Sequence, residues 1–73
     1  MEYLEELREL EAEASELRGD KASLAKAILI KARDLIILAS NTIEDGRKIR
    51  KSTILNIEEL LYEADQTIHL TLN

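Results

Sequence analysis

The chain has 73 residues, a formal net charge of −5, and no cysteine, proline, phenylalanine or tryptophan. A chain of this length forms one domain, and without cysteine it has neither a disulfide nor a thiolate metal site to stabilise it. The acidic balance argues against nucleic-acid binding, which requires a basic surface, and no apolar run approaches the roughly 20 residues of a membrane span. The acidic first ten residues do not resemble a signal peptide, and the localisation stays unknown.

Alanine, leucine, isoleucine, glutamate, lysine and arginine dominate the composition, which favours helices over strands. The first predicted helix covers about residues 2–18. Its apolar residues recur on one side at helical spacing, and its glutamates occupy the other. These apolar residues are Tyr3, Leu4, Leu7, Leu10, Ala14 and Leu17. Such a two-faced helix is expected to cover a core.

Gly19 and Asp20 form the first predicted break. Gly19 suits the left-handed conformation that closes a helix, and Asp20 is expected to cap the next helix. A link this short makes the two helices antiparallel neighbours. Arg18, Gly19 and Asp20 also spell the tripeptide that many integrin ligands present on a loop. A helix stop and restart requires the same residues, so whether the tripeptide is functional stays open.

The second predicted helix covers about residues 21–44 and is apolar nearly all round. Its predicted core face consists of Leu24, Ile28, Leu35, Ala39 and Ile43. Ile30 and Ile37 lie seven residues apart on roughly the opposite side. A helix of this kind is normally buried by something beyond one neighbour.

Two positions compete for the second turn. Gly46 favours a break at 45–46, although Arg47 and Lys48 would then oppose the dipole of the next helix. The alternative break at 40–41 places Asn41 as a cap and leaves Gly46 inside a helix, at a cost of about 1 kcal/mol. We favour the break at 45–46.

The third predicted helix covers about residues 47–71 and frays near its end. Ile54, Ile57, Leu61, Ala64 and Ile68 form its core face. Leu55, Tyr62 and His69 form a second stripe at intervals of seven residues. Three helices with short links predict an all-α, up-down-up antiparallel three-helix bundle that spans residues 1–73.

The second stripes predict a contact surface on helices 2 and 3 for a protein partner. Its predicted residues are Ile30, Ile37, Leu55, Tyr62, Gln66 and His69. A tyrosine among aliphatic residues with a polar edge is typical of an interface. The alternative function is self-assembly of the bundle through the same surface. A core wide enough to include Ile30 or Leu55 would remove the surface altogether.

Enzymatic chemistry has little support in the sequence. Asp65 and His69 have the i, i+4 spacing of metal ligands, but two ligands do not make a site, and no other histidine is present. Glutamate rows on a small helical bundle lie in water and not in a cleft that raises a pKa. We therefore expect no catalytic residue, no metal or other cofactor, and no small-molecule substrate.

The stretch LEELRELEAEASELRGDKASLAKA resembles computationally designed helical miniproteins, of the kind made as target binders or epitope scaffolds. The resemblance covers about residues 1–27, whereas residues 28–73 carry Asn, Thr, Gln and His where an idealised scaffold has Glu, Lys or Ala. It implies that the first helix is a support and that the second and third helices present the contact surface.

Overall fold

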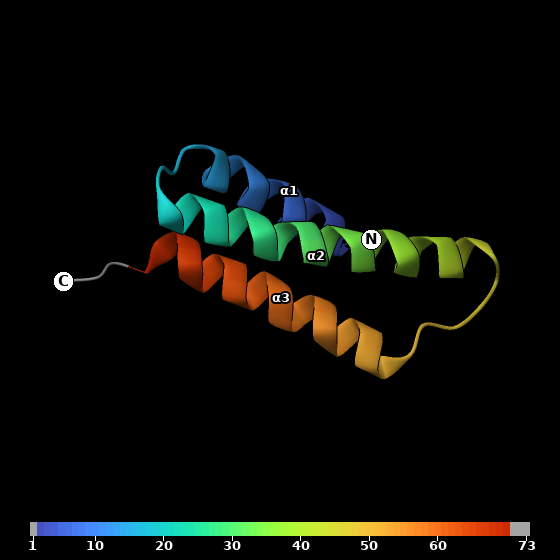
Figure 1. The fold of residues 1–73 in the computed structure, drawn as a ribbon. Helices are drawn as coiled ribbons and strands as arrows, with labels where there is room; N and C mark the ends of the chain where they lie inside the picture. The colour runs from blue at the N-terminus through green and yellow to red at the C-terminus, as the bar shows by residue number, and fades with distance from the viewer. Residues whose placement is uncertain (1, 71–73) are drawn as a thin grey trace.

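The computed structural model describes residues 2–70 and contains α1 (Glu2–Ser15), α2 (Asp20–Glu44) and α3 (Lys51–His69). The helices run up, down and up, and each contacts the other two (Figure 1). No strand occurs within residues 2–70. The predicted all-α three-helix bundle is confirmed. None of the helices in this range has the length and apolarity required to cross a membrane.

The first link begins earlier than predicted, because α1 ends at Ser15 and not near residue 18. The backbone N–H groups of Glu16 and Leu17 donate to carbonyls three residues back, at 3.2 and 3.1 Å. Such bonds tighten a final helical turn. The prediction that Asp20 caps α2 is wrong, because Asp20 is the first residue of the helix. Gly19, with φ +77°, occupies the cap position. The negative charge of Asp20 still stabilises the helix, because it lies at the positive end of the helix dipole.

The second turn lies at 45–46, as predicted. Gly46 has φ +76°. The Gly46 N–H donates to the Ile43 carbonyl and the Arg47 N–H to the Thr42 carbonyl, each at 3.0 Å. This pair of bonds is the Schellman motif, which ends a helix at a glycine with positive φ. The break at 40–41 is excluded, because α2 continues through both residues.

α3 begins at Lys51, four residues later than predicted. Arg47 and Lys48 thus stay outside the helix, where they do not oppose its dipole. Ile49 packs against the core from the link. At the other end of α3, Lys21 Nζ donates to the Leu70 carbonyl at 2.8 Å. The predicted end of this helix, at residue 71, lies outside the described residues.

The core is narrow and rich in alanine. α2 buries four alanines, at 22, 25, 32 and 39, but only two larger residues, Leu29 and Ile36. α1 contributes Leu7, Leu10 and Ala14, and α3 contributes Ile57, Leu61, Ala64 and Ile68. Alanine lets helix backbones approach closely, which leaves little room for larger side chains between them. Most of the large aliphatic residues of α2 therefore lie outside the core.

The predicted core face of α2 is therefore partly wrong. Leu24 and Ile43 are 57% and 53% exposed, and Ile28 and Leu35 are half-buried, so that only Ala39 of the predicted set is fully buried. Ile43 lies seven residues beyond the buried Ile36, on the same side of the helix. It is exposed because α2 continues past the N-terminus of α1 (Figure 1).

Candidate functional site

The predicted contact residues are all exposed. Ile30, Ile37, Leu55 and Tyr62 are 61%, 48%, 62% and 64% exposed, and Gln66 and His69 are exposed as well. The alternative of a wider core that includes Ile30 or Leu55 is therefore excluded.

The six residues do not share one surface. Ile30 borders a hollow with Glu11 of α1 and Lys26 of α2. Tyr62 borders a different hollow, with Tyr3 of α1 and Glu58 of α3. Because α1 contributes to both hollows, it separates the Ile30 stripe from the Tyr62 stripe. A single flat partner cannot cover both stripes at once.

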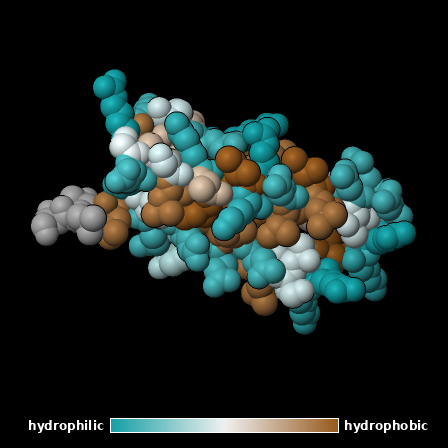
Figure 2. Space-filling model, viewed as in Figure 1, coloured by the Kyte–Doolittle hydropathy of each residue, from teal (hydrophilic) through white to brown (hydrophobic). Residues whose placement is uncertain are grey.

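A third apolar surface lies between α2 and α3, on the side away from α1. It includes three exposed leucines: Leu24, Leu38 and Leu70 are 57%, 58% and 53% exposed. The half-buried residues Ile28, Leu35 and Leu60 lie between these leucines along the two helices. Figure 2 shows apolar side chains gathered over α2 and along its border with α3. We name this surface the α2–α3 groove.

Sequence reasoning missed the groove because it assigned Leu24, Ile28 and Leu35 to the core. The signal was present, however. On α2, Leu24, Ile28, Leu35 and Leu38 lie at the three- and four-residue spacing of a helical seam, interrupted by Lys31. α3 contributes only Leu60 and Leu70 to this side, so its sequence gives little sign of the groove.

The middle of the α2–α3 groove is acidic. Lys31, Asp34, Glu59 and Glu63 line it beside Leu35 and Leu60. One positive and three negative charges give this stretch a net charge of −2. Arg47, Lys48 and Arg50 lie around the hollow at the far end, near Leu38. A ligand lying along the groove therefore passes an acidic middle and a basic end.

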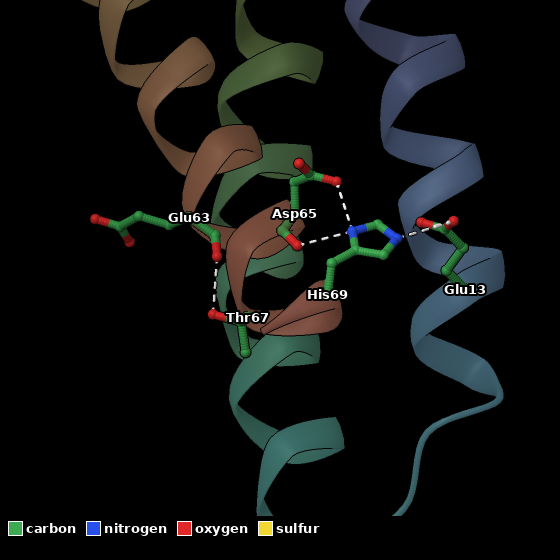
Figure 3. Close-up of polar contacts among 5 residues, drawn as sticks. All are labelled: Glu13, Glu63, Asp65, Thr67 and His69. Atoms are coloured by element: carbon green, nitrogen blue, oxygen red, sulfur yellow. Dashed lines mark hydrogen bonds and ion pairs between the residues drawn. The ribbon is translucent and has the colours of Figure 1, made fainter. Parts of the chain in front are cut away.

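His69 joins two helices through hydrogen bonds at both ring nitrogens (Figure 3). Its Nδ1 lies 2.9 Å from Oδ1 of Asp65 and 3.0 Å from the Asp65 carbonyl oxygen. Its Nε2 lies 3.3 Å from Oε1 of Glu13 on α1. The hydrogen bond to the Asp65 carbonyl is the main cause that raises the pKa of His69, and both carboxylates add to it, whereas partial burial acts against them.

Glu13 is the member of this cluster that sequence reasoning missed. It is one of several glutamates on α1, and the sequence does not distinguish it from Glu9 or Glu16. Its place opposite His69 follows from the register between α1 and α3. A second contact of the same register occurs at Tyr3, whose phenol is hydrogen-bonded to Glu58; burial and then this carboxylate raise the pKa of Tyr3.

Arg18 and Gly19 in the first link and Asp20 at the start of α2 are all exposed. No known protein family, characterised protein or solved structure matches the chain. The surfaces of the bundle are therefore the only indication of its function.

Proposed function

We propose that the protein is a small, non-enzymatic binding module that takes up an amphipathic helix of a partner protein in the α2–α3 groove. The observation that carries the proposal is the row of Leu24, Leu38 and Leu70, each more than half exposed, above a half-buried apolar floor. Full burial of one such side chain is worth about 1.5–3 kcal/mol. A helix in this groove would complete a four-helix bundle.

The middle of the groove favours basic residues in the central part of the partner helix, whereas Arg47, Lys48 and Arg50 at the far end favour acidic residues at one end of it. The net charge of −2 around Lys31, Asp34, Glu59 and Glu63 attracts lysine or arginine on both sides of an apolar seam. A second copy of this chain fits less well. A two-fold axis through the middle of the groove would bring six carboxylates together with two lysines, and like charges in register are unfavourable.

The remaining elements agree with this proposal. α1 packs on the side opposite the groove, which is the supporting role that the resemblance to designed miniproteins implies. The polar residues Asn56, Glu59, Glu63 and Thr67, which an idealised scaffold would replace in part, lie along the α3 side of the groove. They would form the polar edge of the interface.

The test uses two synthetic amphipathic peptides of about three heptads, with leucine at positions a and d. One peptide carries lysine at e and g, and the other carries glutamate there. We expect the lysine peptide to bind at least about tenfold more tightly by fluorescence anisotropy, with the difference reduced by salt. Binding of neither peptide, or equal binding of both, would contradict the proposal.

Three single variants identify the contact surface. Leu38→Glu places a charge in the groove, Ile30→Glu places one beside α1 and α2, and Tyr62→Ala removes the tyrosine beside α1 and α3. Leu38→Glu should weaken the lysine peptide by at least about tenfold, and the other two should leave its affinity unchanged. A loss confined to Tyr62→Ala or Ile30→Glu would instead support the contact residues predicted from the sequence.

Self-assembly is the second candidate, and the two stripes beside α1 favour it. The Ile30 stripe has Lys26 and Arg33 as neighbours on its helix, whereas the Tyr62 stripe has Glu58 and Asp65. Opposite charges on two different patches favour head-to-tail contacts, which give rings or filaments. Sedimentation equilibrium over a range of concentrations tests this: a larger species that the double variant Ile37→Glu/Tyr62→Glu dissolves would establish it.

A further inference from the structure

We propose that His69 and Glu13, oriented by Asp65, form a binding site for a divalent transition-metal ion of the zinc type, which joins α3 to α1. The site is separate from the α2–α3 groove and does not depend on the proposed function. The sequence supplies only the pair Asp65 and His69 on one helix face, and folding adds Glu13 from a second helix.

The distance between His69 and Glu13 suits an ion held by two protein ligands and water. One potential ligand atom from each of Glu13, Asp65 and His69 lies within 4.8 Å of the other two. Zinc bonds of about 2.0–2.2 Å at tetrahedral angles place two ligand atoms about 3.3–3.5 Å apart. The observed separation of His69 Nε2 and Glu13 Oε1 is 3.3 Å. An ion bound to both atoms would take the place of the proton on Nε2 and would lie to one side of the line that joins Nε2 and Oε1.

Asp65 acts as a positioning residue. Its carboxylate and its backbone carbonyl both lie within hydrogen-bond distance of Nδ1, at 2.9 and 3.0 Å. They accept the Nδ1–H, which leaves the lone pair of neutral His69 on Nε2, where it faces Glu13. A carboxylate behind a ligating histidine fixes the tautomer and raises the basicity of the ligand in this way.

The donor set selects the kind of ion. Imidazole nitrogen with carboxylate oxygen suits zinc, nickel or copper, whereas Mg²⁺ prefers an all-oxygen shell. The side chains of His69, Glu13 and Asp65 are 54%, 47% and 45% exposed. An ion can therefore enter without opening the bundle, and water completes its coordination shell.

The first experiment measures the melting temperature by circular dichroism at about pH 7.5, where neutral imidazole is available, with increasing ZnCl₂ and, separately, MgCl₂. An ion that binds only the folded arrangement raises the melting temperature. We expect a saturable rise with zinc and none with magnesium. His69→Gln should abolish the rise, and Glu13→Gln should reduce it, whereas Glu9→Gln removes the same charge from the same helix and should leave it unchanged.

NMR of the His69 ring gives the second readout, which does not depend on stability. Zinc should shift the Nε2 resonance, and the ring of the zinc-free protein at high pH should carry its proton on Nδ1. Asp65→Ala should weaken zinc binding by about tenfold and increase the fraction of the Nε2–H tautomer.

The proposal is overturned if His69→Gln retains the full zinc effect, or if the ring resonances do not respond to zinc. It is also overturned if sedimentation shows that the stabilised species is always an oligomer, because the ion would then bridge chains and not the two helices of one chain. These outcomes do not bear on the groove, because the cluster lies between α3 and α1 whereas the groove lies between α2 and α3.

Discussion

At the scale of single residues, the charge of His69 connects α1 to the end of α3. In the folded state its pKa is raised, chiefly by the Asp65 carbonyl and also by the carboxylates of Glu13 and Asp65. The folded protein therefore binds a proton more tightly than the unfolded chain. This stabilisation is fully present below the unfolded pKa and is lost as the pH rises through the folded one.

The corresponding prediction concerns stability between about pH 5.5 and pH 8.5, above the range in which ordinary carboxylates titrate. With a chelator present, His69→Gln should lower the melting temperature most at the acidic end of this range and progressively less towards the basic end. NMR titration should give a His69 pKa above its usual value, and Glu13→Gln should lower it. A difference between the wild type and His69→Gln that grows with pH would contradict the assignment.

The two link glycines provide a matched pair of substitutions. Gly46 terminates a Schellman motif, whereas Gly19 combines φ +77° with ψ −155°, a region open essentially to glycine alone. An added Cβ meets no atom within 4 Å at either position, so any cost is conformational. Asparagine tolerates the left-handed helical region. We expect Gly46→Asn to cost less than about 1 kcal/mol and Gly19→Asn about 1–3 kcal/mol in urea unfolding. Equal costs would contradict this distinction.

At the scale of the helices, α2 explains both the success and the failure of sequence reasoning. Three helices and the turn at Gly46 followed from composition, helical periodicity and one glycine. The core face of α2 did not follow, because a helix that is apolar all round has no single preferred face. The large side chains of Leu24 and Ile43 suggested burial, whereas in the folded bundle the alanines of α2 lie in the core. The pairing of Glu13 with His69 could not be predicted from the sequence either, since it depends on how far α1 is shifted along α3.

The burial of alanines on α2 predicts which of them tolerate a larger side chain. Ala32 is fully buried, and Ala27 on the same helix is exposed. Ala32→Leu should force the helices apart and cost about 1–3 kcal/mol. Ala27→Leu, the control, should change stability by less than about 0.5 kcal/mol. Urea denaturation of both variants measures the difference, and a tolerated leucine at Ala32 would show that the helices are not held at alanine spacing.

At the scale of the whole molecule, the bundle presents three apolar surfaces whose charges differ. The acidic middle of the α2–α3 groove distinguishes a foreign helix with basic residues at its centre from a second copy of the chain. If this charge keeps the bundle monomeric, its removal should allow pairing. The triple variant Asp34→Asn/Glu59→Gln/Glu63→Gln keeps the shape of the groove and changes the net charge of its middle from −2 to +1, since Lys31 remains.

We therefore predict that sedimentation equilibrium finds the wild type monomeric at concentrations at which the triple variant dimerises. A further Leu38→Glu substitution should return the variant to the monomer, because the new contact uses the groove. The control Glu2→Gln/Glu5→Gln/Glu9→Gln removes three exposed charges from α1 and should stay monomeric. If the control dimerises as readily, net charge and not the groove keeps the chains apart. A dimeric wild type that Leu38→Glu dissociates would show that this groove binds a second copy, and the foreign helix would no longer be its favoured occupant.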